Sequence, residues 1–215
     1  MTTTYSIIFG LTADPIHLGH EQAIINGIQH LQGLNITIKE FILIPVYQPN
    51  LIAGKKGPVA SFEQRLNMCQ LVATRLSKQF MSNIVVSNVE KRIANLTGKN
   101  NYSLNTLKHL NKINCLFMVS ADHFHGRWPK FRKWFGHKEI LKHSGLLINQ
   151  RPGNKINKNF INQLKTINPS IYLVENLKSI NTSSTKIRAS FKIDDMSSHL
   201  SPDIIDYIES EHLYL

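Results

Sequence analysis

Short apolar runs alternate along this chain with longer stretches whose apolar residues repeat at helical spacing. Tyr5 to Phe9 and Phe41 to Ile44 are compact runs of the kind that form buried strands. Between them, Ile24, Ile28 and Leu31 share one face of a helix predicted over residues 20–31. Such alternation predicts βαβ units, and therefore an α/β fold with a doubly wound, mostly parallel sheet and helices on both faces.

The same pattern predicts the other elements. Strands are expected over residues 5–9, 41–44, 84–89, 116–119, 146–148 and 171–174. Helices are expected over 20–31, 61–80, 103–110, 134–142, 159–166 and 185–191, with a last helix capped by Ser201 and begun by Pro202. Ser61 and Gln64 form a capping box for the second helix. Its apolar face carries Leu66, Cys69, Val72 and Leu76. We expect one domain over 1–215, with a short C-terminal helical part over about 181–215.

Composition narrows the class of protein. The chain has 215 residues, 42% apolar and 18% charged, which indicates a folded protein with a sizeable core. No apolar run approaches the roughly 18 residues of a membrane span. The first ten residues lack a basic segment, so they are interpreted as a strand and not as a signal peptide. Cys69 and Cys115 lie in apolar segments, which favours core thiols and a cytoplasmic location.

The net charge of +11 favours anionic partners, because a positive field raises the rate at which they meet the protein. Nucleoside triphosphates and nucleic acids are both anionic, and the charge could also serve solubility alone. The basic residues are scattered, and the sequence carries neither an aromatic RNP pattern nor a GXXG loop. Nucleic acid is therefore the less favoured partner.

The first candidate motif follows the first predicted strand and spans residues 10–20. It contains Asp14, Pro15, His17 and His20 and leads directly into a helix. If this turn is helical, the two histidines lie close together. Imidazole N–H groups at a helix N-terminus suit phosphate oxygens. A bare His-x-x-His also occurs as a metal pair or as surface polarity.

The second candidate motif spans residues 181–188 and contains Ser183, Ser184, Thr185 and Arg188. Hydroxyl groups before a helix cap free backbone N–H groups, and the positive helix end attracts anions. Arg188, about one turn into the helix, could pair with a phosphate. The alternative is an ordinary helix cap with a surface arginine.

Together the two motifs resemble those of the nicotinate- and nicotinamide-mononucleotide adenylyltransferases, which have a Rossmann-like fold. That family carries G-x-F-D-P-x-H-x-G-H, matched here by Asp14, Pro15, His17, Gly19 and His20, and I-S-S-T-x-I-R, matched by residues 183–185, 187 and 188. The chain departs from the first pattern at Leu11 and Ala13, and from the second at Thr182.

The resemblance extends through the middle of the chain. Residues 101–107 are similar to S-Y-T-x-x-T-L, residues 119–122 to I-G-x-D with Ser120 for Gly, residues 131–134 to F-x-x-W, and residues 150–153 to R-R-P-G. The P-P-H-K-like loop usual after Pro45 is replaced by residues 47–50, with Lys55 and Lys56 beyond. Asp122, His123 and His125 would also be compatible with a metal site, although no further ligand pair accompanies them.

The resemblance implies specific roles for these residues. His17, His20 and Arg188 are expected to be catalytic. The expected ATP contacts are Gly10, Thr12, Asp14, Gly19, Asp122, Ser183, Ser184 and Thr185. The expected contacts to the pyridine mononucleotide are Tyr102, Ser103, Asn105, Thr106, Trp134 and Arg151. No metal-ligating residue is assigned, and Mg²⁺ is expected to enter bound to ATP.

The implied reaction is transfer of AMP from ATP to nicotinate or nicotinamide mononucleotide, which forms a dinucleotide and pyrophosphate in NAD biosynthesis. The sequence does not decide between the two acceptors. Two alternatives stay open: the same chemistry on another phosphate, such as a phosphopantetheine, and a nucleotide-binding relative without activity.

Overall fold

A computed structural model describes residues 3–49, 57–98, 101–150, 155–175, 178, 180–191 and 195–214. Within these residues, six strands form one sheet in the order β3-β2-β1-β4-β5-β6, and every pairing is parallel. The strands are β1 Thr4–Leu11, β2 Thr37–Pro45, β3 Ile84–Val86, β4 Cys115–Ser120, β5 Gly145–Asn149 and β6 Ile171–Val174. This order is that of the Rossmann-like doubly wound sheet, so the predicted fold class is confirmed.

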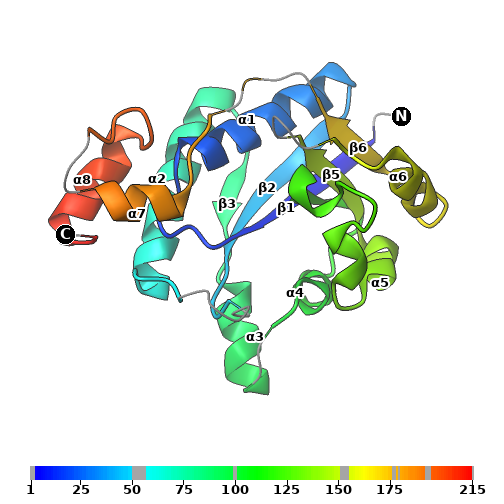
Figure 1. The fold of residues 1–215 in the computed structure, drawn as a ribbon, viewed down its shortest axis with the longest axis horizontal. Helices are drawn as coiled ribbons and strands as arrows, with labels where there is room; N and C mark the ends of the chain where they lie inside the picture. Colours follow the sequence, from blue (N-terminus) through cyan, green and yellow to red (C-terminus); the bar gives the residue numbers. More distant parts are fainter. Residues whose placement is uncertain are drawn as a thin grey trace.

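Helices cover both faces of this sheet (Figure 1). The helices are α1 Leu18–Gly33, α2 Phe62–Phe80, α3 Val89–Thr97, α4 Ser103–Leu110, α5 His137–His143, α6 Lys158–Lys165, α7 Ser184–Ser190 and α8 Pro202–Ser210. Two short 3-10 helices, η1 Ala121–His123 and η2 Lys130–Lys133, follow β4. No helix among the described residues has the length and apolarity that crossing a membrane requires.

Strand residues alternate between two cores. Ile7 and Leu43 pack with α1, α2, α7 and α8 on one face, whereas Ile8 and Ile42 pack with α3, α4, α5 and α6 on the other. Successive side chains of a strand point to opposite faces, which explains this division. Strands buried on both sides read as continuous apolar runs, and this made them recognisable in the sequence.

Local sequence fixes several helix ends. The Ser61 hydroxyl accepts a hydrogen bond from the Gln64 backbone N–H at 3.2 Å, and the Gln64 side-chain oxygen accepts one from the Ser61 N–H at 3.0 Å, so the predicted capping box is confirmed. Ser201 precedes α8 as predicted, but its hydroxyl does not cap that helix. It donates to Glu21 at 2.9 Å and accepts from Arg75, linking α8 to α1 and α2.

Two predicted elements were wrong in extent. The strand predicted over 84–89 ends at Val86, and the chain then forms α3, which the sequence analysis missed. Helix α3 has only nine residues, and its first residue, Val89, was taken as the end of the apolar run that begins at Ile84. The helix predicted over 134–142 begins at His137, because Gly136, with φ of 63°, separates it from η2. Trp134 therefore follows a 3-10 helix and does not start an α-helix.

Candidate active site

A cavity of about 800 Å³ opens at the carboxyl edge of the sheet, where β1 and β4 are neighbours. The segment after β1 packs on one face of the sheet and the segment after β4 on the other, so this edge is the switch point where such sheets bind ligands. The predicted site residues that line the cavity are Gly10, Thr12, Asp14, His17, Gly19, His20, Asp122, Trp134, Ser183, Ser184, Thr185 and Arg188. The fold thus brings both sequence motifs to one place.

The two histidines form one wall of this cavity. His17 directly precedes α1, and His20 lies in its first turn. Their imidazole rings stack with centroids 3.8 Å apart and planes inclined by 24°. The predicted proximity is therefore confirmed. His17 is only 3% exposed and His20 is half-buried, so His20 is the more accessible ring.

Gly19 makes room for the first of these rings. A Cβ atom placed on Gly19 would lie 3.0 Å from two atoms of the His17 imidazole and 3.1 Å from the Thr182 methyl group. The glycine between the histidines therefore permits close packing of the two motifs. Its expected contact to ATP stays a prediction.

The second motif docks directly on the first. The Ser184 hydroxyl donates to the Pro15 carbonyl at 3.0 Å, and the Arg188 guanidinium donates to the Asp14 carbonyl. Arg188 Nη1 also lies 3.3 Å from Asp14 Oδ2. The Ser183 hydroxyl caps α7 by accepting from the Lys186 N–H at 3.3 Å. The C-terminal part of the chain consequently fixes the loop between β1 and α1.

Asp14 is the centre of this docking. Its carboxylate is 1% exposed and receives the Val59 N–H at 2.9 Å, the Ala60 N–H at 3.0 Å and the Tyr214 hydroxyl at 2.8 Å, in addition to Arg188. We call these groups the Asp14 cluster. Because the carboxylate already has four donors, we infer that Asp14 shapes the loop.

Trp134 lies at the β4 side of the cavity. Its ring makes edge contacts with the rings of Phe117 and His123, whose centroids lie 6.2 Å and 5.0 Å away. It makes a tilted contact with the ring of Phe131, with a centroid distance of 5.3 Å. A large aromatic surface in a cavity wall suits a flat heterocycle. Asp122 is nearby, with Oδ2 at 3.7 Å from His123 Nε2. Within the described ranges, no three His, Cys, Asp or Glu residues gather as metal ligands would.

The residues predicted from the Tyr102 to Thr106 segment lie outside the described cavity lining. Tyr102 precedes α4, is 45% exposed and contacts Phe135 with ring centroids 4.8 Å apart. Ser103 and Asn105 are half-buried in α4. Thr106 is buried, and its hydroxyl donates to Glu90 at 3.2 Å. Their contacts to a mononucleotide stay a prediction.

Glu90 was missed by the sequence analysis. Its carboxylate also accepts the Tyr47 backbone N–H at 3.0 Å, so it joins α3, α4 and the segment after β2. Burial raises the pKa of Glu90, against the opposing effect of its hydrogen bonds from Tyr47, Thr106 and Asn101.

Arg65 is the second missed residue. It is 2% exposed and donates to four backbone carbonyls: Ala60 at 3.3 Å, Thr12 at 2.8 Å, Val46 at 2.6 Å and Tyr47 at 3.4 Å. Burial lowers the pKa of this guanidinium, and the Asp14 carboxylate opposes that effect. Arg65 thereby ties the loop after β1 to the segment after β2.

Further polar groups in the cavity wall were also missed. Ser120 ends β4, Asn149 ends β5, and the two are register partners. Ser120 Oγ, Asn149 Oδ1 and Thr182 Oγ1 are buried and have no hydrogen-bond partner in the described part of the protein. Since Ser120 replaces the glycine of the family pattern, its hydroxyl was a visible signal in the sequence.

Some predicted positions lie outside the described residues, namely Arg151 and residues 50–56 of the loop that contains Lys55 and Lys56. A separate groove of about 870 Å³ between α2 and α8 is lined by residues such as Arg75 and Tyr207. It contains none of the predicted site residues. The cavity beside His17 and His20 is therefore the candidate active site.

Comparison with known proteins gives one family and several relatives. Residues 8–190 match the cytidylyltransferase-like family. A "Probable nicotinate-nucleotide adenylyltransferase" of Wigglesworthia glossinidia brevipalpis is 29% identical over 221 residues, or 96% of this chain and 95% of that protein. The protein of the same name in Aquifex aeolicus is 30% identical over 151 residues, or 68% and 77%.

The solved structure of the Plasmodium falciparum nicotinic acid mononucleotide adenylyltransferase complexed with NaAD is similar in fold. Its TM-score is 0.73 at 22% identity, over 99% of this chain and 97% of that chain. The same enzyme complexed with APC gives a TM-score of 0.72. At this identity, the likeness concerns the arrangement of helices and strands.

Proposed function

The chain belongs to the cytidylyltransferase-like family, in the group of the nicotinate-nucleotide adenylyltransferases, and we propose that it transfers AMP from MgATP to nicotinate mononucleotide. The single observation that carries this proposal is the convergence of His17, His20 and Arg188 on one cavity whose opposite wall holds Trp134. Cationic and N–H groups on one side suit a triphosphate, and an aromatic surface on the other suits a pyridine ring.

The reaction is a displacement at the α-phosphorus of ATP. A 5′-phosphate oxygen of the mononucleotide forms a new bond to that phosphorus, the bond to the bridging oxygen breaks, and pyrophosphate leaves with its electron pair. The attacking phosphate is already anionic at neutral pH, so no protein nucleophile is required. Catalysis then rests on positioning and on stabilising the charge that develops.

Each residue has a part in this scheme. His17 and His20 donate to the α- and β-phosphates, and the more exposed His20 supports the charge of the transition state. Arg188, held by Asp14, pairs with the β- or γ-phosphate. Ser183 and Thr185 lie at the start of α7 and contact the departing phosphates. The Ser120 hydroxyl and the Asn149 side-chain oxygen have no hydrogen-bond partner in the described residues, and we assign both to the ligand.

Mg²⁺ enters as part of the MgATP substrate, where it neutralises charge on the phosphates. Asp14 is saturated by its own cluster, and no group of three candidate ligands exists among the described residues. Phosphate oxygens and water therefore supply most of the magnesium shell.

The acceptor assignment rests on Trp134 and on the relatives. The Plasmodium enzyme is known with NaAD, and the relatives are named for nicotinate nucleotides.

We also propose that the protein is located in the cytoplasm, because Cys69 and Cys115 are free, buried thiols of the kind kept in reducing compartments.

The test is pyrophosphate release from MgATP with nicotinate or nicotinamide mononucleotide, measured side by side. We expect release with nicotinate mononucleotide and a fall in turnover of about 10²- to 10³-fold for His20→Ala. His109→Ala, at an exposed position on α4, is the matched control. Release with neither acceptor, despite ATP binding, would contradict the proposal and point to another phosphate acceptor or an inactive relative.

A further inference from the structure

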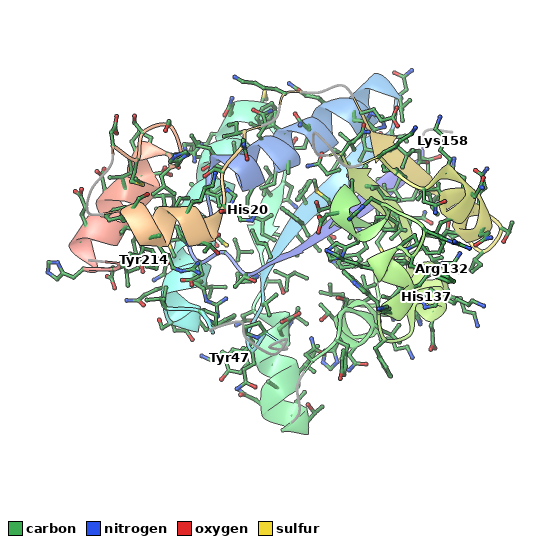
Figure 2. The ribbon with its side chains drawn as sticks, in the orientation of Figure 1. His20, Tyr47, Arg132, His137, Lys158 and Tyr214 are labelled. Carbon is green, nitrogen blue, oxygen red and sulfur yellow. The ribbon has the colours of Figure 1, made fainter. Side chains whose placement is uncertain are left out.

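Tyr214 contributes a hydrogen bond to the phosphate side of the cavity from the far end of the chain. Its hydroxyl donates to Asp14 Oδ1 at 2.8 Å across 200 positions of sequence. Its ring makes an edge contact with that of Phe191, the residue after α7, with centroids 6.4 Å apart (Figure 2 shows Tyr214 below α7). Burial, together with the hydrogen bond to Asp14, raises the pKa of Tyr214 above its ordinary range, which fits the hydroxyl as a donor to the carboxylate.

Tyr214 and Arg188 contact different oxygens of the same Asp14 carboxylate. Tyr214 and the Ala60 N–H donate to Oδ1, whereas the Val59 N–H and Arg188 meet Oδ2. Because a carboxylate is planar and rigid, the donors on one oxygen set the direction of the other. The Tyr214 hydroxyl and the Arg188 guanidinium are therefore linked through this carboxylate, while Arg188 also donates to the Asp14 backbone carbonyl.

We propose that Tyr214 is a positioning residue of the phosphate site, which acts through Asp14 to orient Arg188 toward the triphosphate. The proposal rests on the proposed function, because it gives Arg188 a phosphate to bind. Tyr214 itself touches Asp14 and Phe191 and is absent from the described cavity lining. Its effect on the reaction is consequently indirect.

Removing one oxygen atom tests this role. Tyr214→Phe keeps the ring contact with Phe191, and Asp14 Oδ1 keeps the Ala60 N–H. Tyr207→Phe is the matched control, because Tyr207 lies on α8 and its hydroxyl accepts from Asn67 at 3.2 Å, beside the groove away from the active site. The two variants lose the same group from the same part of the chain.

The readouts are kcat and KM for MgATP and for nicotinate mononucleotide, with the thermal midpoint of each protein. We expect Tyr214→Phe to lower kcat/KM for MgATP about tenfold, because an imperfectly oriented donor stabilises the transition state less. KM for the acceptor should stay within a factor of about two, since the Asp14 cluster lies on the phosphate side. Tyr207→Phe should match the wild type in all of these values.

Two further variants identify the path. Tyr214→p-aminophenylalanine restores a donor on the same ring and should recover most of the lost kcat/KM. Tyr214→Phe combined with Arg188→Lys should lose less than the product of the single effects, because residues that act through one another are not additive.

The outcomes separate the two proposals. A wild type that releases no pyrophosphate with either mononucleotide overturns both of them. If the wild type is active, three results overturn the inference alone: unchanged kinetics in Tyr214→Phe, an equal loss in Tyr207→Phe, or a Tyr214→Phe variant whose thermal midpoint falls while its kcat/KM for MgATP stays the same. A loss confined to MgATP kinetics, with recovery by the amino analogue, supports it.

Discussion

The His17 imidazole packs so closely over Gly19 that a single added methyl group at Gly19 would meet two atoms of the ring at 3.0 Å. The spacing of the two histidines is therefore not enough to define this motif. The residue between them must also leave room for the first ring. The stacked arrangement of His17 and His20, at 3.8 Å, depends on that space.

Gly19→Ala is expected to damage the reaction more than the fold. The Cβ atom would displace His17 from the His20 ring, and we expect kcat to fall roughly 10- to 100-fold, since small misplacements of catalytic groups are costly. Gly33→Ala, at the other end of α1 and with open space around its Cβ, is the control. Steady-state kinetics of both variants decide the matter, and equal activities would contradict the role of Gly19.

Glu90→Gln probes the connection between the segment after β2 and α4. One carboxylate oxygen that accepts from Tyr47 or Thr106 becomes an N–H₂ donor, so one of these hydrogen bonds is lost. We expect KM for nicotinate mononucleotide to rise about 3- to 10-fold while KM for MgATP is unchanged, as one hydrogen bond contributes roughly 1 kcal/mol. Glu139→Gln, at an exposed ion pair with Lys108, should alter neither KM.

The raised pKa of Glu90 also predicts how stability depends on pH. The folded protein binds the Glu90 proton more tightly than the unfolded chain, in which the pKa of this carboxyl is 4.5. Glu90 therefore contributes its full stabilisation of the folded state below pH 4.5. That contribution is lost as pH rises through the higher pKa of the folded protein. Urea unfolding across this window should show Glu90→Gln gaining stability relative to wild type as pH increases. A constant difference between the two proteins would contradict the shift.

Arg65→Lys tests a buried cation that is not expected to contact ATP or the mononucleotide itself. Lysine keeps the charge but cannot reach the carbonyls of Ala60, Thr12, Val46 and Tyr47 together. We expect the free energy of unfolding to fall by about 2–3 kcal/mol, because hydrogen bonds to charged groups are strong and because lysine would leave buried carbonyls without a donor. Urea unfolding measures this loss. Arg92→Lys on exposed α3 surface should change stability by less than about 0.5 kcal/mol.

Asn149→Ala and Asn157→Ala separate ligand binding from folding. Asn149 Oδ1 is buried in the cavity wall without a partner in the described residues, so its loss should raise a substrate KM and leave the unfolding free energy nearly unchanged. Asn157 caps α6 through Phe160 and donates to the Gly126 carbonyl. Its loss should cost about 1 kcal/mol of stability with normal kinetics. The reverse pattern would contradict the ligand-binding role of Asn149.

The parts of the fold that were predictable are those with strong periodic signals. Strands buried on both faces are continuous apolar runs, and α2 carries both a capping box and an apolar face. Helix α3 was not found because it is short and its first residue, Val89, was assigned to the preceding strand. Trp134 was assigned to a helix because the left-handed conformation of Gly136 was not foreseen.

The site residues that belong to short sequence motifs were predictable, whereas those whose role depends on tertiary contacts were not. The two histidines and Arg188 were visible in the sequence, and the fold brings them to one cavity. Arg65 lies on the buried face of α2, whereas Leu66, which was predicted for that face, is only half-buried. The interior position of Arg65 follows from the Ala60 carbonyl just before α2 and from three carbonyls of two distant segments, which no local pattern encodes.

The bond between Asp14 and Tyr214 also bears on when the site is completed during synthesis. Chains leave the ribosome N-terminus first, so Asp14 and both histidines emerge long before residue 214. The Asp14 cluster closes a loop of 200 positions, and contacts of that sequence separation form late because so much chain must be ordered first. A nascent chain stalled before Tyr214 thus carries the histidine motif without its finished support, and we expect full activity only after the last helix has been made and docked.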